Sequence, residues 1–233
     1  MLFDAGGVLT RPVGGRWNPR HDFESVVVRH HPEVDTARFP EAIAAGQRFL
    51  DAGETTPVRA DYHRAVLVVL GVAEPTPALL TELEAPPSGP VVELYPDVPR
   101  TLERLHAAGI RMSVVSDNWA GLEAGLDGLG IAHFFAGFVV SELMGCTKPD
   151  PRMYAAGSAL IDLPPHECLF VDDDPELVAA AVALGYRGVA LVRDGEPPSG
   201  AGWVRTLDAL ATRWAPALPP ASGSSSCAAP PSS

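Results

Sequence analysis

Lysine is almost absent from this sequence: of its 17 basic residues 16 are arginine, and Lys148 is the single lysine. Acidic residues number 29, so the net charge is −12 at pH 7. A protein that binds nucleic acid needs a basic face that approaches the phosphate backbone. We therefore expect no nucleic-acid partner.

Long apolar runs and cysteines are also scarce. No run reaches the roughly 18–20 apolar residues that a membrane span needs, and Met1–Asp4 has neither the basic nor the apolar region of a signal peptide. Cys146, Cys168 and Cys227 are an odd number without metal-ligand spacing, which argues against a disulfide framework and a zinc site. We expect a cytoplasmic protein that does not contact membranes.

What is present is a chain of 233 residues, 46% of them hydrophobic and 20% charged, enough for one sizeable domain with an appendage. Beyond residue 90, short apolar runs alternate with helical patterns of about ten residues, which is typical of βαβ units. The predicted strands are Ile110–Val115, Phe138–Val140, Cys168–Val171 and Gly188–Val192. We predict an α/β fold with a Rossmann-like parallel sheet.

Residues 16–90 have a different pattern, with apolar residues at helical spacing and no strand between them. The predicted helices are Phe39–Leu50, Val58–Leu70 and Ala78–Leu83. We predict that 16–90 form an α-helical domain inserted into an α/β core made of residues 1–15 and 91–215. Residues 216–233 are rich in proline, serine and glycine, and we expect them to be a disordered tail.

Four short segments place reactive side chains where strands are predicted to end, which is the edge at which parallel sheets bind ligands. Asp4 ends an apolar run before two glycines, where a carboxylate can act as a nucleophile and the backbone can approach a phosphate. Ser116 ends the next strand and can donate a hydrogen bond. Lys148 lies in a proline-flanked turn and supplies a compact charge.

The fourth segment holds three adjacent carboxylates, Asp172 to Asp174, after a predicted strand. Their mutual repulsion would be relieved by a divalent cation, and Mg²⁺ prefers such oxygen ligands. Each segment alone also has a purely structural interpretation. Asp4 can cap a turn, Ser116 can cap a helix, Lys148 can be a solvated surface residue, and acids are favoured at a helix N-terminus.

In combination, the four segments resemble the motifs of the haloacid dehalogenase-like hydrolase superfamily. The family's Asp-x-Asp-Gly-[Thr/Val]-Leu is matched by Asp4–Leu9, and its strand-end Ser or Thr by Ser116. Its Lys-Pro-Asp-Pro is matched by Lys148–Pro151, and its acidic pair by Asp172–Asp173. The resemblance covers roughly residues 1–195, and it identifies the helical insert as the family's small cap of the first class.

The resemblance implies a Mg²⁺-dependent phosphatase that hydrolyses a small-molecule phosphate monoester through an aspartyl-phosphate on Asp4. The catalytic residues it implies are Asp4, Ser116 and Lys148, and the phosphate-binding residues are Ser116, Asp117, Asn118 and Lys148. The metal ligands it implies are Asp4, the Gly6 carbonyl, Asp172 and Asp173. Arg16 and Trp17, soon after the nucleophile, would contact the substrate from the cap. A monomer or homodimer is expected.

One departure from the family pattern concerns the chemistry. The family's phosphatases usually have a second Asp that protonates the leaving group, and this chain has Gly6 in its place. General acid-base catalysis is typically worth about 10²–10⁴ in rate. A second departure is Leu177, where Asn often follows the acidic pair. The alternative function is therefore a catalytically impaired family member with a binding or regulatory role.

Two other activities of the family fit the residues less well. Haloacid dehalogenases lack the metal-binding acidic pair, because they attack carbon, so Asp172 and Asp173 argue against that activity. Phosphonate-cleaving members form a Schiff base on a cap lysine, and residues 16–90 contain no lysine.

Overall fold

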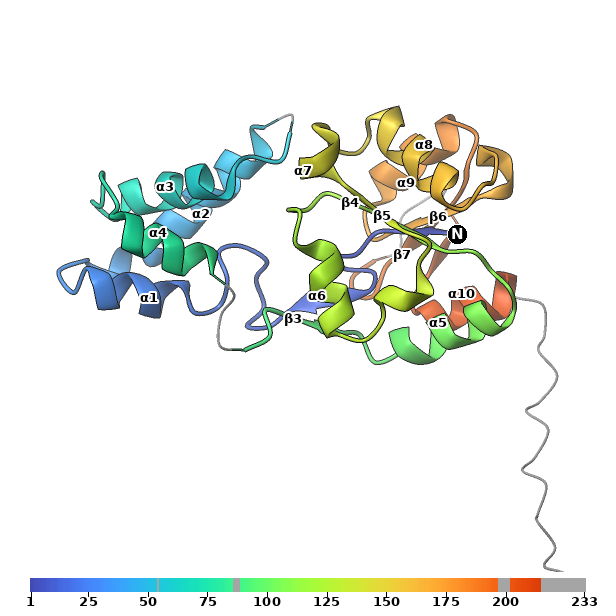
Figure 1. Cartoon of the computed structure of the whole chain (residues 1–233), viewed down its shortest axis with the longest axis horizontal. Helices are drawn as coiled ribbons and strands as arrows, with labels where there is room; N and C mark the ends of the chain where they lie inside the picture. Colours follow the sequence, from blue (N-terminus) through green and yellow to red (C-terminus); the bar gives the residue numbers. More distant parts are fainter. Residues whose placement is uncertain (54, 86–88, 197–201, 215–233) are drawn as a thin grey trace, which may run out of the picture.

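The computed structural model describes the whole chain except residues 54, 86–88, 197–201 and 215–233. It has a part built on a β-sheet and, beside it, a part built of helices (Figure 1). The tail predicted for 216–233 lies outside the described residues. No helix in the described ranges is both long and apolar enough to cross a membrane.

A six-stranded sheet of parallel strands, in the order β5-β4-β1-β6-β7-β8, confirms the predicted fold class. The strands are β1 (Leu2–Phe3), β4 (Ser113–Ser116), β5 (Phe138–Val140), β6 (Leu169–Asp172), β7 (Arg187–Leu191) and β8 (Trp203–Val204). The short strand β1 is central, because Leu2 is paired both with Ser113 of β4 and with Phe170 of β6. The chain order reverses on either side of β1, which makes the carboxyl edge there a natural ligand site.

Helices cover both faces of this sheet (Figure 1). One face packs against α5 (Val98–Ala107) and α10 (Leu207–Trp214), and the other against α8 (Pro151–Leu160) and α9 (Pro175–Ala183). The two residues of β1 are fully buried on opposite faces: Phe3 belongs to the first apolar cluster and Leu2 to the second. This double burial holds β1 in register, so Asp4 emerges at the carboxyl edge.

The shorter elements of the sheet part lie between these helices and strands. They are the helices α6 (Leu122–Gly128) and α7 (Ser141–Met144), and single 3₁₀ turns at Ala132–Phe134 and Pro165–Glu167. Helix α7 follows β5 directly, so it stands at the same carboxyl edge as Asp4.

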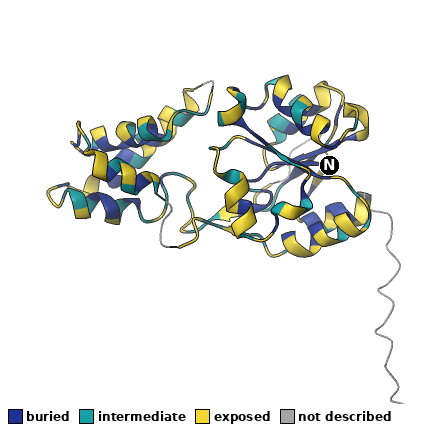
Figure 2. Ribbon diagram, viewed as in Figure 1, coloured by how far each residue is buried: buried dark blue, intermediate teal, exposed yellow. Residues whose placement is uncertain are grey.

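The helical part has a hydrophobic core of its own. It consists of α1 (Phe23–His30), α2 (Phe39–Asp51), α3 (Arg59–Val69) and α4 (Pro77–Glu84), with a 3₁₀ turn at Thr36–Arg38. The buried faces of these helices turn toward one another (Figure 2). Helices α2 and α3 approach so closely that a Cβ on Gly46 would lie 2.5 Å from a methyl carbon of Val66.

The chain leaves the sheet part and returns to it at one place. Strand β2 (Thr10–Pro12) is antiparallel to β3 (Val92–Leu94), and Arg11 of β2 forms an ion pair with Glu93 of β3. Because β2 follows the Asp4 turn by a few residues, this ribbon joins the helical part to the sheet beside the carboxyl edge of β1 (Figure 1).

Candidate active site

One buried ammonium group joins two carboxylates at the carboxyl edge of the sheet. Lys148 Nζ donates hydrogen bonds to Asp4 Oδ1 at 2.8 Å and to Asp172 Oδ2 at 2.7 Å. Asp4 lies just beyond β1, where its backbone N–H donates to the Val171 carbonyl, and Asp172 ends β6. Burial alone would lower the pKa of Lys148, but the charges of Asp4 and Asp172 outweigh it and raise this pKa. The single lysine of the chain is therefore a permanent cation in the site.

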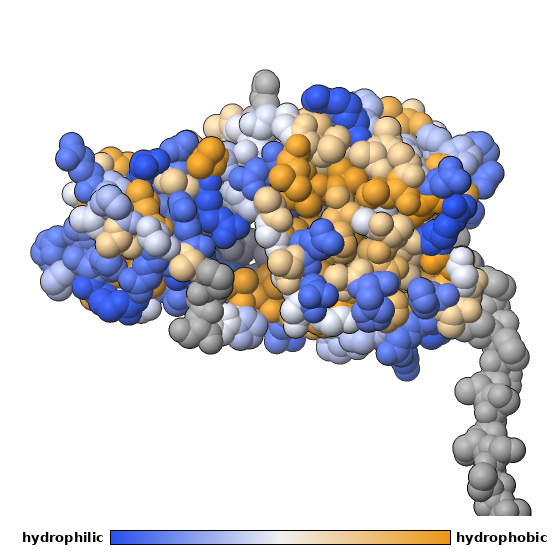
Figure 3. Space-filling model, viewed as in Figure 1, coloured by the Kyte–Doolittle hydropathy of each residue, from blue (hydrophilic) through white to orange (hydrophobic). Residues whose placement is uncertain are grey.

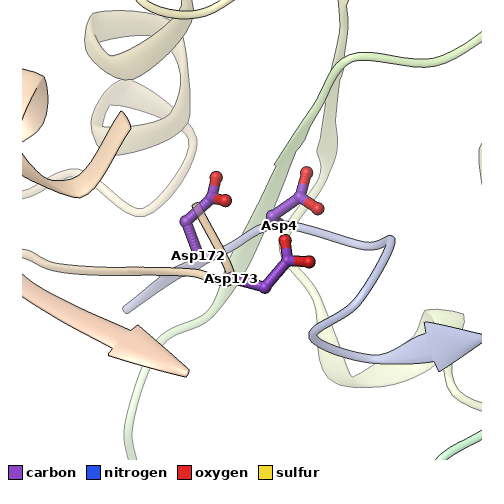
Figure 4. A group of neighbouring side chains, drawn as sticks. All are labelled: Asp4, Asp172 and Asp173. Atoms are coloured by element: carbon purple, nitrogen blue, oxygen red, sulfur yellow. The ribbon is translucent and has the colours of Figure 1, made fainter. Parts of the chain in front are cut away.

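A third carboxylate completes the group. Asp4, Asp172 and Asp173 each offer an oxygen atom, and these atoms lie within 4.8 Å of one another (Figure 4). Burial and the nearby charge of Asp4 raise the pKa of Asp172 to about 7 and that of Asp173 to about 6. Three carboxylates around one ammonium leave an excess of negative charge, which a divalent cation with a preference for oxygen ligands would balance. The residues present therefore fit Mg²⁺.

The turn after Asp4 depends on a glycine. Gly7 has a φ of +70°, and a Cβ at this position would lie 2.0 Å from Asp173 Oδ2. Only glycine lets the backbone come this close to the acidic group. Gly6 precedes it without a positive φ, and a Cβ there would be 3.8 Å from Asp4 Oδ2.

The predicted phosphate-binding residues follow β4, the strand next to β1. Ser116 is buried at the strand end. Asp117 Oδ1 accepts a hydrogen bond from the Lys148 backbone N–H at 3.0 Å, which ties the two loops together. Burial, together with the charge of Asp4, raises the pKa of Asp117. Ser116 and Asp117 therefore stand together at the carboxyl edge of the sheet, beside the turn that carries Lys148.

Asn118 supports the loop after β4 itself. Its side-chain oxygen accepts from the Trp119 N–H at 2.8 Å, and its own N–H donates to Ser141 Oγ at 2.9 Å. These bonds give Asn118 a structural role whether or not it also contacts phosphate.

The two residues predicted to contact substrate, Arg16 and Trp17, differ in how much of the side chain is already engaged by other residues. The Arg16 guanidinium donates to both oxygens of Glu24 and to the Pro19 and Arg20 carbonyls, so all its nitrogens are engaged within its own loop. The Trp17 ring reaches the site: two of its carbon atoms lie 3.4 Å from where a Cβ on Gly6 would be, and 46% of the residue remains exposed.

Sequence reasoning missed Arg193, which braces the turn after Asp4. Its Nε donates to the Gly7 carbonyl at 3.1 Å and its Nη2 to the Val8 carbonyl at 2.7 Å, while its Nη1 binds both oxygens of Asp97. The guanidinium also lies 3.6 Å from the centre of the Tyr95 ring. A bidentate, stacked arginine of this kind holds a loop rigidly.

The helical part also contacts the loop after β4, through Trp119. The indole N–H of Trp119 donates to the Pro57 carbonyl at 2.9 Å, and the Arg59 guanidinium lies 4.6 Å from the ring centre. The hydroxyls of Thr56 and Ser141 share a hydrogen bond nearby. The connection between α2 and α3 therefore rests on the loop that follows Ser116, and Figure 3 shows a recess between the two parts.

A family model described as haloacid dehalogenase-like hydrolase matches residues 1–185. Curated relatives include Phosphatase MT3486 of Mycobacterium tuberculosis, 31% identical over 118 residues, which are 50% of this chain and 54% of the relative. They also include (S)-2-haloacid dehalogenase 4A of Burkholderia cepacia, 30% identical over 105 residues, or 45% and 46% of the two chains. The chain thus spans about half the length of these relatives.

Solved structures share the fold over nearly the whole chain. A crystal structure of a dehalogenase has a TM-score of 0.66 at 22% identity and covers 93% of this chain and 96% of its own. A HAD phosphatase from Thermococcus onnurineus has a TM-score of 0.57 at 17% identity, with 91% and 95% covered. A dehalogenase and a phosphatase thus share this fold, so the fold alone does not indicate which of the two activities a protein has.

Proposed function

We propose that this chain, which belongs to the haloacid dehalogenase-like hydrolases, is a Mg²⁺-dependent phosphatase that acts on a small-molecule phosphate monoester. The observation that carries the proposal is the group formed by Asp4, Lys148 and the acidic pair Asp172–Asp173. A nucleophile that attacks carbon has no need of two further carboxylates beside it. A nucleophile that attacks a phosphate dianion does, because a divalent cation must offset the negative charges.

The metal would be held by Asp4, Asp172, Asp173 and the Gly6 carbonyl. Bound there, it would neutralise charge on the carboxylates and on the phosphoryl oxygens. The Lys148 ammonium and the Ser116 hydroxyl would hold further phosphoryl oxygens.

In the first step a carboxylate oxygen of Asp4 attacks phosphorus. An aspartyl-phosphate forms, the bond from phosphorus to the leaving oxygen breaks, and the electron pair stays on that oxygen. In the second step a water oxygen attacks the same phosphorus. The bond to Asp4 breaks, inorganic phosphate leaves, the water proton passes to solvent, and the carboxylate is restored.

The helical residues 16–90 act in this proposal as a small cap on a core made of 1–15 and 91–215. The hydrophobic core of α1–α4 and the paired strands β2 and β3 support that division. The cap would cover the substrate and exclude water during the reaction. We place the protein in the cytoplasm, as a monomer or homodimer.

A binding or regulatory family member without turnover is the second candidate, and Gly6 is the observation that favours it. The assay that separates the candidates is phosphate release from a panel of phosphate monoesters, with Mg²⁺ and with chelator. We expect release that requires Mg²⁺, is lost in Asp4→Asn and persists in the matched surface variant Asp127→Asn. Mg²⁺ binding without any release would favour the second candidate. Halide release from a 2-haloacid would identify a dehalogenase instead.

A further inference from the structure

The space beside the nucleophile is bordered by an aromatic ring. A Cβ on Gly6 would lie 3.8 Å from Asp4 Oδ2 and 3.4 Å from each of the Trp17 ring carbons Cζ2 and Cη2. The indole is therefore the immediate neighbour of any group at residue 6. It cannot replace a carboxyl group as an acid, because an indole N–H donates a hydrogen bond without releasing its proton at neutral pH.

The ring is held in this place by its neighbour in sequence. Arg16 donates hydrogen bonds to the Pro19 carbonyl at 2.8 Å, to the Arg20 carbonyl at 3.1 Å and to the Glu24 carboxylate. These bonds fix the loop that carries Trp17 against α1. Nearly half of Trp17 is nonetheless exposed, so the ring offers free surface next to the reacting carboxylate.

The other carboxyl groups near Asp4 already take part in hydrogen bonds or in the acidic group that fits a cation. Asp172 accepts from the Lys148 ammonium, and Asp117 accepts from the Lys148 backbone. Asp173 lies with Asp4 and Asp172 in the group that fits a cation. Residue 6, from which the family's phosphatases usually supply a second carboxyl group as the acid, is glycine here, so the chain supplies no carboxyl group from that position.

We propose that Trp17 is the specificity-determining residue of this site, and that the substrates are phosphate compounds with a planar, weakly basic leaving group, aryl phosphates above all. This inference rests on the proposed phosphatase function. The leaving oxygen of an aryl phosphate keeps the electron pair of the broken bond as a stable phenolate, so the first step needs no proton donor. The aromatic ring of the leaving group stacks on the exposed indole, which favours planar groups over aliphatic ones.

The first test varies the leaving group. We would measure kcat/KM for substituted phenyl phosphates, from nitrophenyl to alkylphenyl, and for an alkyl phosphate. With no general acid, the rate falls steeply as the leaving group becomes more basic, and the alkyl phosphate is slower by about 10²-fold or more, the usual worth of such an acid. The double variant Gly6→Asp, Trp17→Ala, which restores the carboxyl group and makes room for it, flattens this dependence.

The second test isolates stacking. Nitrophenyl phosphate and acetyl phosphate both have good leaving groups, but only the first has an aromatic ring. We expect Trp17→Ala to raise KM for nitrophenyl phosphate at least tenfold while KM for acetyl phosphate stays within twofold. Trp17→Phe restores the first value, and Trp203→Ala, which removes another exposed tryptophan, changes neither.

Several results would overturn the inference. One is an alkyl phosphate hydrolysed within tenfold of nitrophenyl phosphate by the wild type. Another is an equal rise in both KM values in Trp17→Ala. A protein that releases phosphate from no member of the series, beyond the rate of Asp4→Asn, would instead refute the proposed phosphatase function.

Discussion

Acidification should destabilise this protein through one buried histidine, His63 of α3. This residue is 5% exposed, and its Nδ1 has no hydrogen-bond partner in the described part of the chain. Its ring is stacked on that of Phe23, with the ring centroids 6.3 Å apart and the planes inclined by 22°. Burial, reinforced by the charges of Arg59 and Arg20, lowers the pKa of His63 from 6.5 to about 4.

The sign of the effect follows from where the proton binds. Above pH 6.5 the imidazole is neutral in the folded and the unfolded chain, so its contribution to stability is complete. Between pH 6.5 and pH 4 only the unfolded chain takes up the proton, so the free energy of unfolding falls as the pH falls. A shift of this size, at about 1.4 kcal/mol per pKa unit, corresponds to about 3 kcal/mol lost by pH 4.

The assay compares wild type with His63→Phe, which keeps an aromatic ring beside Phe23 but cannot titrate. Urea unfolding followed by circular dichroism, from pH 8 to pH 4, gives the stability difference between the two proteins at each pH. We expect this difference to shift by about 3 kcal/mol in favour of His63→Phe on acidification. His166→Gln, at an exposed histidine, is the matched control and should show no such shift. A difference that stays constant with pH would refute the reasoning.

Four further outcomes are expected from the candidate site. Asp4→Asn should abolish phosphate release and keep the fold, because an amide cannot form the acyl phosphate; release within tenfold of wild type would exclude Asp4 as the nucleophile. Asp172→Ala should lose Mg²⁺ binding in calorimetry, and an unchanged affinity would contradict the metal assignment. Lys148→Ala should weaken phosphate binding, which is measured as a higher KM. In the presence of chelator it should also lower the free energy of unfolding by about 3–5 kcal/mol, because the buried carboxylates of Asp4 and Asp172 lose their partner. Gly7→Ala should lower both the activity and the stability to urea, because the added Cβ would lie 2.0 Å from a carboxylate oxygen of Asp173. Gly6→Ala should leave the fold intact, because its Cβ would lie 3.4 Å from the ring carbons of Trp17. Equal stability of the two variants would show that the turn can relax.

The sheet, and the gathering of Asp4, Lys148 and Asp172 at its edge, could be predicted because the strands and the residues at their ends have local sequence signals. The three strands beside the site are short apolar runs, and Asp4, Ser116 and Asp172 stand at their ends, as Asp172 does after Val171. Boundaries were less accurate: the strand predicted from Ile110 begins at Ser113, because pairing begins only where β4 meets Leu2. Ser113 is a polar residue within this otherwise apolar strand. It can be buried there because its hydroxyl donates a hydrogen bond to the Gly157 carbonyl.

The elements that were missed are short or lack periodicity. Strand β2 has three residues and ends in a proline, and β8 has two, so neither shows alternation. Helix α1 spans only Phe23–His30, and its three buried side chains are too few to stand out as a pattern.

The missed parts of the site depend on contacts between distant segments. Arg193 is 186 residues from the Gly7 carbonyl that it binds, and nothing near it in sequence indicates that contact. Trp119 likewise meets Pro57 only once the two parts of the chain are folded together. Arg16, which was predicted to contact the substrate, has a partner nearby in sequence: its guanidinium donates to Glu24, eight residues further along the chain.

The contact between Gly7 and Asp173 bears on how a lineage with this fold can change its chemistry. Position 7 favours glycine, since a Cβ there would lie 2.0 Å from Asp173 Oδ2 and the φ of +70° is one that L-residues rarely adopt. Position 6, one residue earlier, has no positive φ, and a Cβ there would contact the Trp17 ring at 3.4 Å and Asp4 Oδ2 at 3.8 Å. Substitutions at position 6 and at Trp17 would therefore add or remove a carboxyl group beside Asp4 without rebuilding the sheet, so that proteins with this scaffold can differ at these two positions while their folds stay superimposable.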